Sequence, residues 1–216
     1  MSTINYPNAP KRFTMQDFRS ASDRFGGFAK SARFAVTISP RSEVLKFLGP
    51  SLAKDLTYLC EVAEMPGRGF LSIEGIRYYG PQFKLPFNTE YSDISLTFLC
   101  RNKQFERQFF DNWMEYINPT DTYHFRYRDN YASEINIWQF SDIGVDYAAA
   151  EYCITLHDAW PVLVNPQSAT WGDDNFQRLT IAFTYSKWTR KGLDSPSGDF
   201  NLVQGKFNNK PVEITR

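Results

Sequence analysis

The amino-acid sequence predicts a mainly β protein, built as a sandwich or barrel, with one packed α-helix at about residues 103–117. Three observations support this fold class. Several runs alternate apolar and polar residues with a period of two, which is typical of strands that turn one face to a core. Aromatic residues make up 17% of the chain, and the 19 Phe and 12 Tyr among them favour strands. Strong helical spacing occurs in one segment, Lys103–Ile117.

Two alternating runs between Tyr152 and Trp188 organise the rest of the prediction. In the second run one face carries Leu179, Ile181, Phe183 and Tyr185, and the other carries small polar residues. This pattern predicts a strand with one face in a core and the other against water or a partner. Because proline cannot donate to a central ladder, we expect Trp160-Pro161 to end the first run.

Further strands are predicted in chain order at Arg33–Ser39, Leu56–Glu64, Ser92–Arg101, Tyr123–Arg128 and Glu134–Trp138. Between them, Arg41–Asp55 has weak helical character and Phe70–Phe87 consists of short extended pieces interrupted by prolines. Pro66-Gly67 suits the two central positions of a type II turn, in which the second residue needs a positive φ.

The predicted helix is defined by an aromatic stripe. Phe105, Phe109, Trp113, Tyr116 and Ile117 recur at helical spacing, whereas Glu106, Arg107, Asp111 and Glu115 mostly point elsewhere. Asn118-Pro119 should end the helix, since the residue before a proline is disfavoured in the helical conformation. We expect the stripe to cover an open face of the β structure.

Length and composition predict one β domain with an arm at each end. At 216 residues the chain can bury one sizeable core. Residues 1–30 are polar, with a short helix possible around Met15–Phe25, and 191–216 are rich in Gly, Asn, Ser and Pro. The predicted organisation is therefore an N-terminal arm at 1–30, a β domain at 31–190 and a C-terminal arm at 191–216.

The sequence shows no catalytic, cofactor-binding or metal-ligating motif, so we expect no enzyme, no cofactor and no metal site. His124 and His157 lie far apart in predicted strands, and the cysteines at 60, 100 and 153 lie in apolar runs, as buried reduced thiols do. The formal net charge of zero disfavours an electrostatically driven nucleic-acid binder and permits self-association. With no long apolar run, we expect no membrane association and synthesis in the cytoplasm.

A carbohydrate-binding sandwich is one alternative to a structural role. Exposed Trp138, Trp160, Trp171 and Trp188 would then stack on sugars, although core and turn packing explains tryptophans in these positions more simply.

The order of these motifs resembles the contractile-tail tube proteins of large, T4-like myophages. The resemblance runs from about Ser31 to Thr189. It rests on the strand Ala32–Ile38, the run Leu59–Gly67 that ends in a Pro turn, and the extended segment Lys84–Asn102. It also rests on Arg107–Trp113 as the single helix and on Trp160-Pro161 followed by a terminal strand ending in Tyr-x-x-Trp.

This resemblance implies a virion structural protein of the tail, assembled in the host cytoplasm. It implies six subunits to a ring and rings stacked into a tube that conducts DNA during genome ejection, without sequence-specific binding. Sheath, tape measure and baseplate proteins are the implied partners. Met65–Phe87 would bridge to the next ring, and the polar-faced runs Ser92–Leu99 and Thr180–Ser186 would make the inner strands.

The chain departs from the family pattern at both ends, because tube proteins of this family are usually shorter. A second possibility is therefore a baseplate-proximal ring of the same fold that initiates the tube or serves as a hub, with its arms holding baseplate subunits.

Overall fold

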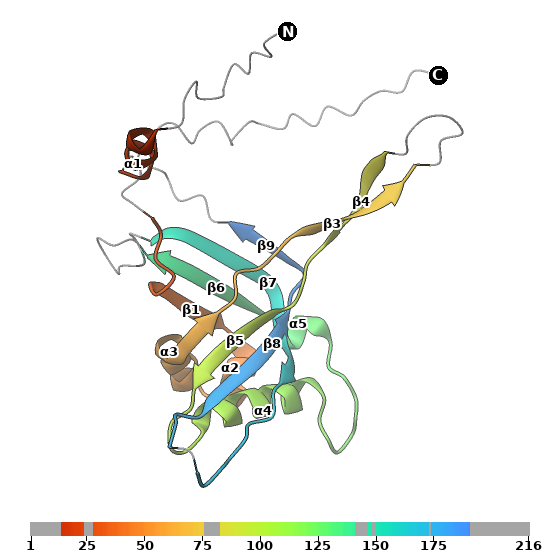
Figure 1. The fold of residues 1–216 in the computed structure, drawn as a ribbon. Coiled ribbons are helices and arrows are strands. Elements are labelled where there is room, and N and C mark those ends of the chain that lie inside the picture. Colours follow the sequence, from red (N-terminus) through yellow and green to blue (C-terminus); the bar gives the residue numbers. More distant parts are fainter. Residues whose placement is uncertain are drawn as a thin grey trace, which may run out of the picture.

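The computed structural model describes residues 14–23, 28–75, 83–140, 147, 150–172 and 174–190, with the side chains of 50, 51 and 151 left aside. The protein is mainly β, as predicted (Figure 1). Its strands are β1 Phe34–Ser39, β2 Cys60–Ala63, β3 Gly69–Glu74, β4 Lys84–Glu90, β5 Ile94–Leu99, β6 Ser133–Phe140, β7 Ala150–Val164, β8 Arg178–Thr184 and β9 Lys187–Arg190. Its helices are α1 Met15–Asp23, α2 Ser42–Leu48, α3 Pro50–Leu59, α4 Phe105–Ile117 and α5 Arg128–Tyr131.

The main sheet has the strand order β1-β6-β7-β8-β5-β2, and β9 adds to β7. The long strand β7 joins the two parts of this sheet, because its first part pairs with β6 and β9 and its last part, Trp160–Val164, pairs with β8. Next to this change of partner, Asp158 has a φ of 55° and the β6–β7 register shifts. An irregularity of this kind bends a strand and increases its twist.

The predicted end of this strand at Trp160-Pro161 is wrong, since β7 continues to Val164. Pairing with β6 stops at Ala159, and Pro161 lies opposite Phe183 of β8. Beyond Ala159 the ladder on the β6 side has ended, so the missing N–H of Pro161 costs no hydrogen bond there. The second predicted run is divided in two: β8 ends at Thr184, and β9 returns to pair with the first part of β7.

The aromatic helix is confirmed, and it covers the sheet as expected. Phe109 and Trp113 are buried, and the rings of Phe110 and Trp113 contact the β8 side chain Phe183 at centroid separations of 6.0 and 6.3 Å. Phe110 also contacts Phe98 of β5. The predicted stripe omitted Phe110, although it is fully buried. The stripe also placed Glu106 away from the core, whereas this carboxylate is buried.

Two predicted strands differ from the structure. In Leu56–Glu64, residues up to Leu59 belong to α3, because Leu52, Leu56 and Leu59 also fit helical spacing, and only Cys60–Ala63 form a strand. Tyr123–Arg128 is not a strand: its Arg126 amide donates to the Ile117 carbonyl at the end of α4, which turns the segment back toward the helix.

The predicted helical segments are confirmed, whereas the predicted turn at Pro66-Gly67 is wrong. Helices α2 and α3 account for the weak helical character of Arg41–Asp55, and α1 lies where the short N-terminal helix was expected. Gly67 lacks the positive φ of a type II turn; among the described glycines Gly49 alone has one. The rest of both arms, at 1–13, 24–27 and 191–216, lies outside the described residues. Within the described part, no helix is long and apolar enough to cross a membrane.

Candidate assembly surfaces

The β3–β4 hairpin extends away from the main sheet (Figure 1). Its strands pair antiparallel from Gly69 opposite Glu90 to Glu74 opposite Lys84, with a register shift between Leu71 and Ser72. Every residue of β3 is exposed, and so is every residue of β4 except Thr89. Sequence analysis identified the extended pieces here but missed that they form one hairpin, because Pro86 and the register shift interrupt the alternation.

The hairpin carries an apolar surface that the described part of the chain leaves exposed. Phe70 is 62% exposed and Phe87 is 74% exposed, although both are aromatic. The other exposed apolar side chains are Leu71, Ile73, Phe83 and Leu85. A two-stranded hairpin is at best marginally stable in water by itself, so exposed apolar residues on both of its strands indicate a surface that is buried in an assembly.

The two strands predicted to line a passage, in Ser92–Leu99 and Thr180–Ser186, lie side by side as β5 and β8. Ile94, Leu96 and Phe98 face the core together with the apolar face of β8, as their burial shows. The opposite face pairs Ser95 with Ala182 and Thr97 with Thr180, and the two threonine hydroxyls lie 3.0 Å apart. This face is small, polar and uncharged at its centre.

One ion pair lies at an edge of this face. Arg178 donates two hydrogen bonds to Glu61 of β2, at 2.5 and 3.0 Å, and these bonds hold the pKa of the Glu61 carboxyl below its usual value. The two charges neutralise each other. At this edge of the face, the described residues Arg178 and Glu61 thus leave no net charge.

The strand order leaves β1 and β2 at the two ends of the sheet. Edge strands present unpaired backbone groups that can add to another chain, which is a hazard for a monomer and a means of assembly for an oligomer. Within this chain, however, α3 lies beside β1, and β1 comes close to β2.

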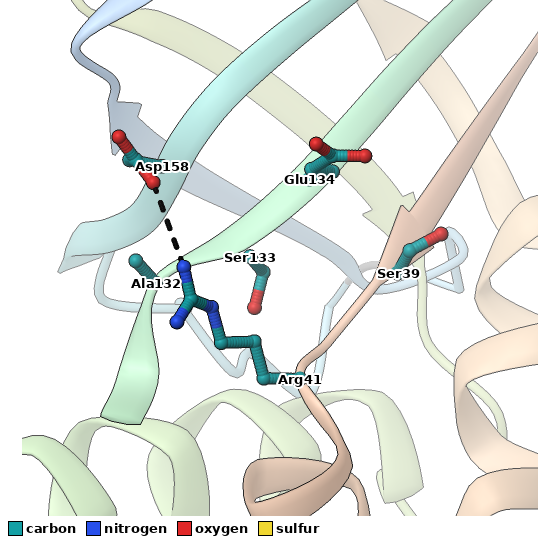
Figure 2. Close-up of a pocket in the computed structure, with 6 residues that line it drawn as sticks. All are labelled: Ser39, Arg41, Ala132, Ser133, Glu134 and Asp158. Atoms are coloured by element: carbon teal, nitrogen blue, oxygen red, sulfur yellow. Dashed lines mark ion pairs between the residues drawn. The ribbon is translucent and has the colours of Figure 1, made fainter. Parts of the chain in front are cut away.

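A polar pocket of about 240 Å³ lies where β1, β6 and β7 come together (Figure 2). Arg41 extends across it to Asp158 at 3.9 Å, and Asp158 also contacts Arg128 at 3.4 Å. Arg41 further donates to the backbone carbonyl of Asp129 at 2.6 Å, and Ser186 donates to Asp158 at 3.1 Å. These contacts hold the irregular part of β7 against its neighbours. The charged side chains around the pocket therefore have a structural role.

Beside this pocket, His157 lies between Glu134 and Thr189. Its Nε2 is 2.7 Å from the Thr189 hydroxyl, but its Nδ1 is 3.6 Å from Glu134, which is longer than a hydrogen bond. The three residues are cross-strand neighbours on β6, β7 and β9. Because the carboxylate does not hold the ring, the arrangement lacks the orienting bond of a nucleophile–base pair.

The cysteines give no reactive centre. All three are free; Cys153 is buried, and Cys60 and Cys100 are partly buried. Burial raises the pKa of the Cys60 thiol to about 12 and also raises the pKa of Cys100. Both thiols therefore stay protonated at neutral pH, whereas a nucleophile needs the thiolate. Within the described ranges, no group of three His, Cys, Asp or Glu side chains is placed to hold a metal ion.

The four tryptophans considered for sugar binding do not form one platform. Trp138 contacts Thr37 and Tyr147, Trp160 packs on Tyr131, and Trp188 donates to the Gly67 carbonyl. Trp171 is fully exposed in the loop between β7 and β8. Packing accounts for three of the four rings, so the carbohydrate alternative has no built site.

Comparison with solved structures finds a similar fold in chains of contractile injection systems. A chain of the sheath–tube complex of the extracellular contractile injection system PVC, in its extended state, aligns with a TM-score of 0.57 at 13% identity, over 84% of this chain and all of that one. A chain of the anti-feeding prophage baseplate gives 0.57 at 12% identity, over 79% and 99%. A chain of the prophage's tube-terminating cap gives 0.54 at 16%, over 76% and 91%.

These identities show a shared fold. A search of curated proteins finds no matching relative. The match to a family model is more direct, because it covers residues 29–191 and therefore the whole described β structure from β1 to β9. The chain belongs to the phage tail tube protein family.

Proposed function

We propose that this chain is the subunit of a contractile tail tube, a non-catalytic structural protein of the virion tail. In this proposal six copies form a ring, the rings stack, and DNA passes through the central channel during ejection. Family membership supports the tube, and the β3–β4 hairpin is the observation that carries the assembly.

The hairpin supports assembly because water is a poor environment for its surface. Each Å² of apolar surface removed from water contributes about 25 cal/mol, and Phe70, Ile73 and Phe87 are all more than half exposed. The strand length supports a bridging role as well, since six or seven residues at about 3.3 Å each extend roughly 20 Å beyond the sheet. In the proposed stack, the hairpin would bridge to the next ring.

The β5–β8 face supports the DNA channel. Its centre, formed by Ser95, Thr97, Thr180 and Ala182, is small and uncharged. A wall of this kind does not bind phosphates strongly, so DNA would move along it without being retained. Sheath, tape measure and baseplate proteins would contact the remaining surface and the ends of the tube, and assembly would take place in the host cytoplasm. The alternative of a baseplate-proximal initiator ring is not favoured over the main tube, since a chain of the sheath–tube complex and a chain of the baseplate align equally well, each with a TM-score of 0.57.

The test is to produce the full chain alone and to examine it by negative-stain electron microscopy and sedimentation. We expect hollow tubes of uniform width. Phe70→Ser combined with Phe87→Ser should prevent stacking, while Thr89→Ser, a change at the partly buried hairpin position, should not. A stable monomer that neither forms rings nor joins tails would contradict the proposal.

A further inference from the structure

The β3–β4 hairpin joins the main sheet through two short links, one from β2 to β3 and one from β4 to β5 (Figure 1). The hydrogen-bonded ladder between its two legs is interrupted at these links. The Glu64 amide donates to the Ser95 carbonyl at 3.2 Å, and the next paired position among the described residues is Gly69 opposite Glu90. Without a further contact, the hairpin would swing relative to the sheet at this interruption.

The Tyr-x-x-Trp ending singled out in the sequence, Tyr185 to Trp188, lies at this interruption. Trp188 of β9 donates from Nε1 to the carbonyl of Gly67 in the first link, at 3.1 Å. The ring of Tyr185, between β8 and β9, lies 6.0 Å from the ring of Tyr91 in the second link. One short segment thus contacts both legs of the hairpin, each at the point where the ladder is missing.

Both aromatic residues of this segment are fixed to the body of the protein. Tyr185 is 8% exposed and belongs to the core, and Trp188 packs against the core. Between them, the Ser186 amide donates to the His157 carbonyl at 3.0 Å, and Trp188 lies opposite Leu156 in the β7–β9 register. The segment therefore connects the links of the hairpin to β7, the strand that joins the two parts of the main sheet.

The first link is held so that its carbonyl meets the tryptophan. The Glu64 carboxylate accepts a hydrogen bond from the Ser95 amide at 2.8 Å, which fixes the start of the link on β5. Pro66 is buried, and its ring restricts the backbone immediately before Gly67. The Gly67 carbonyl is thus presented to Trp188 by a backbone with little freedom of its own.

We propose that Tyr185 and Trp188 are positioning residues, which clamp the two legs of the hairpin at its root and set the direction in which the hairpin leaves the sheet. Trp188 holds the first leg by a hydrogen bond, and Tyr185 holds the second leg by a ring contact. A direction that is fixed in the free chain lowers the entropy lost when the hairpin meets a partner. The inference goes beyond the proposed function, because it concerns the single chain and holds whether or not copies form a tube.

Cleavage by trypsin tests the clamp, because Arg68 lies exposed in the first link and a bond is cut only when its backbone opens. The full chain is used with Phe70→Ser and Phe87→Ser, the changes expected to prevent stacking. Mass spectrometry follows cleavage after Arg68 and after Lys103, an exposed residue of the loop before α4. Trp188→Phe keeps a ring but removes the donor, so cleavage after Arg68 should become about tenfold faster, as the loss of one hydrogen bond predicts, while cleavage after Lys103 stays unchanged.

The direction of the hairpin is measured in the same background by single-molecule energy transfer. Dyes are attached to p-azidophenylalanine in place of Ser72 of β3 and Asp111 of α4, which are both exposed. The background chain should give one narrow distance distribution, and Trp188→Phe should give a broader one. Tyr91→Leu, which removes the ring contact of the second leg, should broaden the distribution as well.

Two control variants change similar groups without releasing the hairpin. Trp138→Phe removes the same kind of donor on β6, where the indole N–H donates to the Thr37 hydroxyl of β1 at 3.2 Å. Tyr185→Phe keeps the ring and removes a hydroxyl that has no hydrogen-bond partner among the described residues. Both controls should leave the cleavage after Arg68 and the distance distribution unchanged.

Three outcomes decide the matter. Faster cleavage after Arg68 alone, with a broader distance distribution, would support the clamp. Cleavage that rises equally after Arg68 and Lys103 in the Trp188 variant would show a general loss of stability and overturn the inference. Distance distributions as narrow as that of the background chain in both Trp188→Phe and Tyr91→Leu would overturn it too. Failure of the unchanged chain to form tubes would contradict the proposed function and leave the clamp standing.

Discussion

Glu106 is a buried carboxylate that joins the start of α4 to the preceding loop. It is 1% exposed, and it accepts hydrogen bonds from the Arg101 amide at 3.0 Å and from Arg101 Nε at 2.6 Å. Arg101 also pairs with Asp55 of α3 at 2.9 Å, and its bonds to these two carboxylates raise its pKa. One carboxylate thus ties the first turn of α4 to Arg101 in the loop after β5, although its place in the sequence suggested an exposed helix face.

Replacing Glu106 with Ala should lower the free energy of unfolding by about 2–3 kcal/mol, because the Arg101 amide loses its acceptor and the guanidinium loses a partner. Urea denaturation monitored by circular dichroism measures the change. Asp111→Ala is the control: Asp111 is half exposed and pairs with Arg107 at 3.4 Å on the same helix, so its loss should cost about 0.5 kcal/mol or less. Equal losses of stability in the Glu106 and Asp111 variants would contradict the role of Glu106 as a buried hydrogen-bond acceptor.

At the scale of elements, the strands and the aromatic helix were predictable where one periodicity was strong. β1, β5, β6 and β8 each alternate over at least six residues, and the α4 stripe recurs over three turns. The errors fall where one pattern fits two structures. Leu52, Leu56 and Leu59 fit a helix as well as part of a strand, and Tyr123–Arg128 alternates although none of the described strands pairs with it.

The assembly surfaces were only partly predictable for a related reason. Alternation predicts a buried face, but it does not say whether this chain or another covers that face. Phe70 and Tyr123 therefore look in the sequence like core residues, and only the fold shows that both are exposed. The polar face of β5 and β8 was predictable, because threonine and serine at alternate positions of a strand indicate a face that turns away from the core.

The aromatic face of α4 holds the helix on the sheet, so truncating its centre should be costly. Trp113 is fully buried, contacts Phe183, and donates from Nε1 to the Tyr131 carbonyl at 3.3 Å. Trp113→Ala should lower the free energy of unfolding by about 3–5 kcal/mol, because it leaves a cavity and removes one of the two hydrogen bonds to the Tyr131 carbonyl, which Ser133 also contacts. Phe105→Ala, at the exposed end of the same stripe, should cost about 1 kcal/mol. Thermal and urea unfolding measure the stability of the two variants. A similar loss of stability in Trp113→Ala and Phe105→Ala would contradict this packing.

At the scale of the whole molecule, the chain separates its surfaces by chemistry. Large apolar side chains are exposed on the β3–β4 hairpin, whereas the centre of the β5–β8 face is small and uncharged, with the exposed Val62 and Leu163 beside it. The chain as a whole is formally neutral. Contacts between copies would therefore depend on apolar burial, and the channel wall would stay free of strong attraction for phosphate.

Changing the charge of that wall tests its assignment to the channel. Thr180 lies at the centre of the face, opposite Thr97. Thr180→Lys places one positive charge per subunit there, so six would surround the channel in a hexameric ring. Tubes of this variant should retain short DNA in co-sedimentation, and the retention should decrease as salt rises, because released counterions drive phosphate binding.

Thr180→Gln is the matched control, since it adds length without charge and should leave DNA unbound, as in the unchanged protein. If the lysine variant binds DNA and the glutamine variant does not, and if the bound DNA is protected from nuclease, then Thr180 lies inside the tube rather than on its outer surface. Lysine-variant tubes that bind no DNA, or that bind it in a nuclease-sensitive form, would show that the β5–β8 face does not line the channel. In that case another face of the sheet would have to form the wall.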